Sequence, residues 1–270
     1  MPSFLFWNLN NKPLGKEVAS LCHEYSVDVL VLAECEITEV ELQRELNHGQ
    51  AATYLAPPNY SSRLKFLTKL PHGSMAPLLD DGGLSIQKIT PPLGDAFLLV
   101  AAHLRSKLHM TESDQMFSAT RVRQAIVDAE KEVSHCRTVV IGDLNMNPFE
   151  NAMVSAEGMH GVLDRRIAAR GTRTVEGKER MFFYNPMWGR MGDSSDGPPG
   201  TYFKDMSNYV NHYWNTFDQV LIRPDLLGCY EDENLVVIAE VGGQSLLSSD
   251  RINRNFSDHL PIYLNLRTEV

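Results

Sequence analysis

Short apolar runs with polar residues directly at their ends are the dominant pattern along this chain. Residues 4–7 run into Asn8, and residues 29–33 run into Glu34. Unbroken apolar runs of about four to eight residues are typical of strands buried on both faces of a sheet. We therefore predict buried strands at residues 4–7, 28–33, 97–104, 138–141, 216–222, 234–239 and 260–266, with two further strands at 59–69 and 83–89.

Segments with helical periodicity lie between several of these strands. Apolar residues recur at helical spacing over residues 14–25 and over residues 38–50. A longer helix is predicted to begin at a cap formed by Thr111 or Ser113 and to continue to about residue 134.

Strands interleaved with helices predict a layered α/β or α+β sandwich. Residues 71–83 and 189–200 are rich in glycine and proline and are predicted to be turns and loops. No internal repeat or break in composition divides the chain. We therefore expect residues 1–270 to form a single domain with a long irregular loop region at about 164–214.

The composition fits a protein with a substantial buried core. With 270 residues and 43% hydrophobic residues, the chain is large enough for one such domain. Its four cysteines form no C-x-x-C pair, which argues against a zinc site or a disulfide framework. No apolar run reaches the roughly 18 residues of a membrane span, and the first residues lack the features of a signal peptide. We expect a cytoplasmic protein without membrane contact.

Charge is distributed unevenly along the chain. A formal net charge of −9 argues against bulk nonspecific binding of nucleic acid. Residues 164–190, however, contain seven basic residues and three acidic ones. This segment is either a solvated loop or a surface that contacts a polyanion.

Aromatic residues are concentrated between residues 181 and 214, beside and partly within the basic segment. They either fill the space beneath a long connection or stack on the bases of single-stranded or distorted nucleic acid. Tyr184 and Tyr202 are the better candidates for exposed stacking residues, and Arg173 or Arg180 would then contact phosphate.

Carboxylates occupy similar positions at the ends of predicted strands, namely Glu34, Asp143, Asp218 and Asp258. Held together, they would repel one another near neutral pH unless a cation or a protonated histidine compensated their charge. Oxygen ligands without an organised set of Cys or His ligands suit hard Mg²⁺ or Mn²⁺ rather than Zn²⁺.

Two motifs are specific enough to suggest a family. Residues 142–145 read Gly-Asp-Leu-Asn, and residues 257–259 read Ser-Asp-His. With Asn8 and Glu34 before them, they resemble the endonuclease/exonuclease/phosphatase superfamily, which includes deoxyribonuclease I, apurinic endonucleases, sphingomyelinases and inositol polyphosphate 5-phosphatases. The resemblance covers almost the whole chain. It implies a four-layer α/β/β/α sandwich of two packed mixed sheets flanked by helices, with the site at one end of the sheets.

The resemblance also implies roles for individual residues. Glu34 would be the principal metal ligand, and Asn8 beside it would help to hold metal-bound water or phosphate. Asp143 would orient or deprotonate the attacking water, and Asn145 would hydrogen-bond the phosphoryl group. Asp258 would support a metal or bound water.

Two histidines complete the implied site. His259 would act on the phosphate or the nucleophile, oriented by Asp218 through its other ring nitrogen. His103 matches the family histidine that stabilises the pentacovalent oxygens or the leaving group. Arg105 and Lys107 follow it and either grip phosphate or are merely solvated.

These patterns predict a phosphoesterase that depends on Mg²⁺ or Mn²⁺ and cleaves phosphodiester bonds, with nucleic acid as the predicted substrate. A small-molecule phosphatase or phosphodiesterase is an alternative, favoured by the acidic net charge and by Glu36, where many nucleases of the family carry a basic residue. A non-catalytic binding module on the same fold is a further alternative, but a pure binder has no use for Asp143 and His259 together. The sequence indicates no obligate protein partner.

Overall fold

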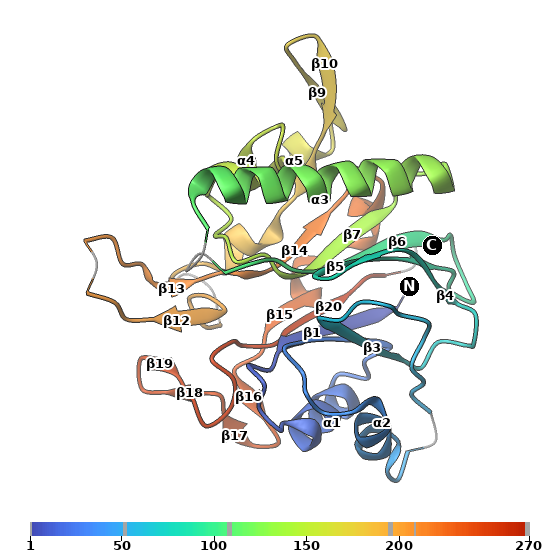
Figure 1. Ribbon diagram of the computed structural model, residues 1–270, viewed down its shortest axis with the longest axis vertical. Helices are drawn as coiled ribbons and strands as arrows, with labels where there is room; N and C mark the ends of the chain where they lie inside the picture. The colour runs from blue at the N-terminus through green and yellow to red at the C-terminus, as the bar shows by residue number, and fades with distance from the viewer. Residues whose placement is uncertain (1, 51–52, 107–109, 194–196, 208, 268–270) are drawn as a thin grey trace.

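Two β-sheets packed face to face form the centre of the computed structural model (Figure 1). The structure describes residues 2–50, 53–106, 110–193, 197–207 and 209–267. Helices α1 (Gly15–Glu24) and α2 (Glu39–Asn47) cover one sheet, and the long helix α3 (Glu112–Val133) covers the other. The layers therefore follow the order α/β/β/α, which confirms the predicted sandwich.

The smaller sheet contains five strands in the order β15-β20-β1-β2-β3. Its strands are β15 (Leu235–Val237), β20 (Ile262–Asn265), β1 (Ser3–Asn8), β2 (Val29–Ala33) and β3 (Leu64–Thr68). Every residue of the parallel neighbours β1 and β2 is buried. Because these strands have no face toward solvent, their sequence is nearly continuous in apolar residues instead of alternating.

The larger sheet contains seven strands in the order β4-β5-β6-β7-β14-β11-β8. Its strands are β4 (Met75–Asp81), β5 (Leu84–Ile89), β6 (Phe97–His103), β7 (Thr138–Asp143), β14 (Asp218–Ile222), β11 (Phe183–Tyr184) and β8 (Gly161–Val162). Strands β6 and β7 are parallel, and β14 is antiparallel to β7. The carboxyl ends of β6 and β7 therefore meet the amino end of β14 at one edge of the sheet.

Apolar side chains fill both sides of the larger sheet. Between the sheets, Phe4 of β1 meets Phe97 of β6 edge to face, with ring centroids 6.0 Å apart. On the other side, Val122 and Ile126 of α3 pack in one cluster with Val140 of β7. The larger sheet is thus covered on both faces, which fixes β6 and β7 as rigid supports for the residues at their ends.

Thr111, one of the two predicted caps, is the N-cap of helix α3. Its hydroxyl accepts the backbone N–H of Asp114 at 3.2 Å, and the Asp114 carboxylate accepts the N–H of Thr111 at 2.9 Å. This capping box satisfies two N–H groups that the first helical turn leaves unpaired. No helix within the described residues is long and apolar enough to cross a membrane.

Small elements surround the sandwich. Three hairpins lie near the end of the sheets at which β7 ends and β14 begins, and a fourth projects past α3 (Figure 1). The first three pair β12 (Tyr202–Lys204) with β13 (Tyr213–Asn215), β16 (Glu240–Val241) with β17 (Gln244–Ser245), and β18 (Leu247–Ser248) with β19 (Arg251–Ile252). The fourth pairs β9 (Thr172–Val175) with β10 (Lys178–Met181). Short helices are α4 (Asn151–Val154), α5 (Arg165–Ala168) and the 3₁₀ helices Pro186–Arg190, Pro224–Cys229 and Asp232–Asn234.

Two stretches that were predicted to be turns or irregular loops contain regular structure. The turn-rich residues 71–83 include β4, an edge strand whose pairing with β5 shifts between Pro77 and Leu79. Edge strands tolerate proline and need no continuous apolar run, so the sequence pattern did not reveal this strand. The region at 164–214 holds α5, the β9–β10 hairpin, β11, β12 and β13 instead of one irregular loop.

Gly142 of β7 permits the close approach of β6. A Cβ at this position would lie 2.0 Å from the carbonyl oxygen of Ala102, and the backbone φ is +154°. We expect Gly142→Ala to lower the free energy of unfolding by about 2 kcal/mol or more, because strands must move apart. The matched control is Gly189→Ala, where a Cβ meets nothing within 4 Å and the change should stay within about 0.5 kcal/mol. Urea unfolding of both variants checks this, and equal midpoints would contradict it.

Candidate active site

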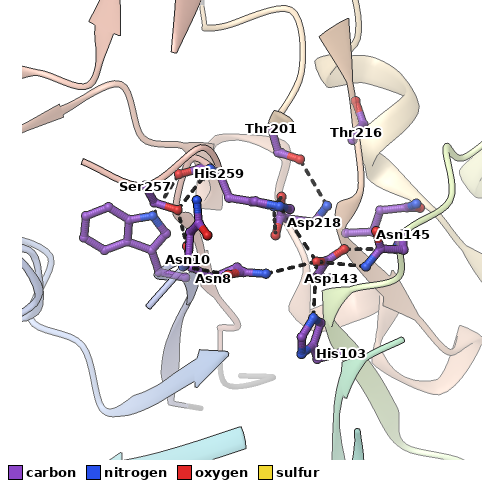
Figure 2. A network of polar contacts seen from close by, with 12 residues as sticks. Asn8, Asn10, His103, Asp143, Asn145, Thr201, Thr216, Asp218, Ser257 and His259 are labelled. Atoms are coloured by element: carbon purple, nitrogen blue, oxygen red, sulfur yellow. Dashed lines mark hydrogen bonds and ion pairs between the residues drawn. The ribbon is translucent and has the colours of Figure 1, made fainter. Parts of the chain in front are cut away.

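Three site residues form a row across neighbouring strands of the larger sheet. Asp143 of β7 is the register partner of His103 on β6 and of Asp218 on β14. Opposite residues on neighbouring strands have side chains on the same face of a sheet. The sheet pairing alone therefore brings a histidine and two aspartates together, although the chain separates them widely (Figure 2).

A tight turn after β7 fixes the carboxylate of Asp143. Asn145, in the left-handed region with φ 52°, donates its backbone N–H to Asp143 Oδ1 at 2.9 Å. Its side-chain Nδ2 donates to Asp143 Oδ2 at 3.1 Å and to the carbonyl of Leu104 at 3.0 Å. The amide of Asn145 thus orients the buried aspartate and ties it to the end of β6.

The smaller sheet contributes Asn8 and Glu34 from the ends of β1 and β2. Asn8 Nδ2 donates to Asp143 Oδ2 at 3.1 Å and lies 3.4 Å from Glu34 Oε1. Asn8 Oδ1 accepts the backbone N–H of Asn10, and this fixed donor sets the orientation of the amide. The Asn8 nitrogen therefore faces the two carboxylates, and its oxygen keeps a second lone pair beside the bond to Asn10.

The segment before β20 positions His259. Asp218 accepts a hydrogen bond from His259 Nδ1, with 2.9 Å between Nδ1 and Oδ2. Ser257 donates to the carbonyl of Asn8 at 2.6 Å and accepts the N–H of His259 at 3.1 Å. Trp7 Nε1 donates to the carbonyl of His259 at 2.9 Å. These contacts hold the ring nitrogen Nε2 of His259 3.9 Å from Asp143 Oδ2.

Opposite charges in this buried setting shift several pKa values. Burial alone would lower the pKa of His259, but the charges of Asp218 and Asp143 outweigh burial and raise this pKa to about 10. Burial raises the pKa of Asp143, and the neighbouring charge of Asp218 raises it further. The hydrogen bond from His103, at 3.2 Å, is the main cause that lowers the pKa of Glu34. A protonated His259 thus faces a carboxylate that binds protons more readily than usual.

These residues line a cleft of about 780 Å³. Tyr202 forms part of its wall, with its ring stacked on Phe217 at 5.2 Å and tilted against His259 at 4.7 Å. Arg63 and Lys204 add positive charge to the lining. The cleft lining thus combines carboxylates, histidines, cations and aromatic rings.

The carboxylates fit a hard divalent cation. Oδ1 of Asp258 is buried and has no hydrogen-bond partner among the described residues. Glu34 lines the same cleft and its side chain keeps 35% exposure. Oxygen donors of this kind are the ligands that Mg²⁺ and Mn²⁺ prefer. Single atoms of Asp143, Asp218 and His259 also lie within 4.8 Å of one another, and Asp218 and His259 are hydrogen-bonded to each other.

Other residues proposed from the sequence lie elsewhere. Tyr184 is only 8% exposed and packs edge-on against Tyr230, so it does not face the cleft. Arg173 donates to His160 Nε2 at 2.8 Å, and Arg180 pairs with Glu157. Both arginines lie on the local β9–β10 hairpin, and neither lines the cleft, so they do not form the cleft wall that the sequence suggested.

Of the two basic residues after His103, the structure describes only Arg105. Arg105 is exposed and is not among the residues that line the cleft. Lys107 lies outside the described residues. The cations that do line the cleft, Arg63 and Lys204, were missed. Arg63 precedes an ordinary strand and Lys204 lies in a short hairpin, so no local motif marked either residue.

The chain was compared with models of known protein families. The family described as Endonuclease/Exonuclease/phosphatase matches residues 5–259. The chain therefore belongs to this family and is a hydrolase that acts on phosphate ester bonds. A search of curated proteins found no match.

Solved structures show the same fold at low sequence identity. An endonuclease/exonuclease/phosphatase family protein from Leptotrichia buccalis is 13% identical, with a TM-score of 0.59 and coverage of 99% of this chain and 100% of that one. A D. rerio TDP2 complexed with single strand DNA product is 16% identical, with a TM-score of 0.55 and coverage of 99% of each chain. The endonuclease domain of TRAS1, a telomere-specific non-LTR retrotransposon, is 12% identical, with a TM-score of 0.51 and full coverage of both chains.

The pairing of His259 with Asp218 makes a direct prediction about protonation. In Asp218→Asn, the pKa of His259 should fall from about 10 by about one to three pH units, because the largest charge that raises it is removed. His259 would then lose its proton closer to neutral pH. An NMR titration of the His259 ring, in a chelator so that no metal contributes, measures this pKa. An unchanged titration midpoint would show that Asp218 does not raise the pKa of His259.

Proposed function

We propose that this chain is a divalent-metal-dependent nuclease that hydrolyses phosphodiester bonds in nucleic acid. The observation that carries the proposal is the buried carboxylate of Asp143, held in the cleft between His103 and His259 and beside the aromatic wall of Tyr202. Two of the proteins with a similar fold are an endonuclease domain and a protein in complex with a single-strand DNA product. Both support a nucleic-acid substrate for this chain.

Asp143 is placed to activate the attacking water. Its raised pKa makes it a better proton acceptor than an exposed aspartate. Asn8 and Asn145 donate to this carboxylate and hold it in one orientation. As the water oxygen bonds to phosphorus, its proton passes to Asp143 while the bond from phosphorus to the leaving oxygen breaks.

The histidines face the negative charge that develops during this step. His259 stays protonated at neutral pH, since its pKa is about 10, and it can donate a hydrogen bond to a phosphate oxygen. His103, which contacts Glu34 at 3.2 Å, lies beside the same carboxylates and can donate to the leaving oxygen. Glu34 and Asp258 would hold the divalent cation, which when bound supplies further positive charge next to the phosphate.

Metal dependence is the first test of this proposal. Turnover should be lost in a chelator and restored by Mg²⁺ or Mn²⁺, but not specifically by Zn²⁺, because the ligands are oxygen atoms. Glu34→Gln should raise the metal concentration needed for half-maximal rate. His259→Ala should lower turnover by roughly 10²–10⁴-fold at saturating metal. Full turnover after thorough removal of metal would refute the proposal.

Substrate choice is tested in the same assay with single-stranded and duplex DNA, RNA and inositol phosphates. Tyr202→Leu should lower kcat/KM for nucleic acid by about tenfold or more, since a stacked base contributes about 1–3 kcal/mol of binding free energy. Tyr202→Phe keeps the aromatic face and serves as the matched control. Ready hydrolysis of inositol phosphates, with no effect of Tyr202→Leu on nucleic-acid cleavage, would favour the small-molecule phosphatase instead.

A further inference from the structure

A second cavity lies next to the active-site cleft, between α5 and the base of the β9–β10 hairpin. It has a volume of about 600 Å³, and its walls are formed mainly by apolar and aromatic side chains. Phe182 and Trp188 are among them, and the exposed Leu163 also lines the cavity. We call this cavity the hairpin pocket.

Aromatic contacts connect the hairpin pocket to the cleft. Phe149, which is 38% exposed, lines the cleft, and its ring lies 6.3 Å from that of Trp188 in the hairpin pocket. On its other side, the Phe149 ring lies 5.5 Å from His212, which also lines the cleft. Aromatic ring contacts therefore connect the lining of the cleft to the lining of the hairpin pocket.

The hairpin pocket offers charge that matches a polyanion. Arg170 and Arg173 both line it and both are exposed. The pocket's acid, Asp164, is already engaged by Arg166 at 3.0 Å and by the N–H groups at the start of α5. Neither Arg170 nor Arg173 has a carboxylate partner among the described residues, so their positive charge is available to a ligand.

Two further contacts indicate a built site. His160 Nδ1 bonds to the carbonyl of Met181, so Nε2 accepts the Nε–H of Arg173 at 2.8 Å. This bond fixes the guanidinium of a residue that lines the pocket, while its Nη groups have no hydrogen-bond partner among the described residues. The indole Nε1 of Trp188, a residue that lines the pocket, is buried without a hydrogen-bond partner among the described residues, whereas buried polar atoms normally have one.

We propose that the hairpin pocket is an accessory subsite for the same nucleic-acid strand that is cleaved in the cleft. A base of the flanking single strand enters the apolar pocket beside Trp188, and Arg170 and Arg173 contact its phosphates. The inference rests on the proposed nuclease function, because it says where the part of the nucleic-acid strand outside the cleft is bound. It accounts for the aromatic ring contact that joins Phe149 in the cleft to Trp188 in the hairpin pocket.

The experiment compares a dinucleotide, which reaches only the cleft, with a single-stranded dodecamer. For each variant the ratio of kcat/KM for the dodecamer to that for the dinucleotide is measured. Trp188→Leu should lower this ratio by about tenfold, as expected for a lost stacking contact. Arg173→Gln should also lower it, and should reduce the slope of log Kd against log salt for the dodecamer by about 0.7, as expected for one lost phosphate contact.

Lys178→Gln is the matched control. It removes one positive charge from the same hairpin, but Lys178 does not line the hairpin pocket. The ratio should therefore stay at the wild-type value. Equal ratios in the wild type, Trp188→Leu and Arg173→Gln would overturn the subsite, while cleavage itself would still support the nuclease.

Binding of a labelled dodecamer, measured by fluorescence anisotropy, separates the two proposals if neither substrate is cleaved. Absent cleavage refutes the nuclease function. Weaker dodecamer binding by Arg173→Gln than by Lys178→Gln would then support binding of a nucleic-acid strand at the hairpin pocket without cleavage, and equal binding would overturn that as well. Binding of an apolar dye in the pocket, undisturbed by the dodecamer, would assign the pocket to an apolar ligand and also overturn the proposal.

Discussion

The buried carboxylate of Asp143 is the group on which the rest of the site depends. It accepts hydrogen bonds from Asn8, at the end of the smaller sheet, and from Asn145, in the turn after β7. His103 and His259 approach the same oxygen from two further segments. Because a buried charge is costly unless several donors surround it, these partners must all be in place for the carboxylate to stay ionised.

This requirement explains the architecture around the site. At the site, the hydrogen bond from Asn8 to Asp143 links the two sheets, and the apolar clusters on both faces of the larger sheet hold β1, β6 and β7 in position. Asp218 is fully buried and compensates the charge of His259. A buried ion pair of this kind adds little to stability on balance, but it fixes the orientation of a reactive group. The geometry of the cleft is therefore a consequence of how the sheets pack.

Local patterns in the sequence predicted the buried strands and the helices, and the family resemblance implied the four-layer order and the set of site residues. Continuous apolar runs mark β1, β2, β6 and β7, which are covered on both faces. Polar residues at the ends of such strands meet at one edge, so Asp143 and His259 could be assigned to one site. The edge strand β4 was missed because it is only partly buried and is interrupted at Pro77.

Residues outside the strand ends could not be placed in this way. Tyr184 and Tyr202 belong to the same aromatic stretch, but Tyr184 lies in β11 inside the sheet while Tyr202 lies in a hairpin beside the cleft. Arg173 and Arg180 found partners in His160 and Glu157, which only the folded chain brings near. Long-range pairing decides such positions, and a single sequence carries no local signal for it.

The most direct test of this account is the turnover of Asp143→Asn at saturating Mg²⁺. The substitution keeps the shape of the side chain but removes its charge and its capacity to accept a proton. The account predicts that kcat falls by roughly 10²–10⁴-fold, while binding of a single-stranded oligonucleotide and the melting temperature change little. A variant that binds normally and turns over within a few-fold of the wild-type rate would contradict the central role of Asp143.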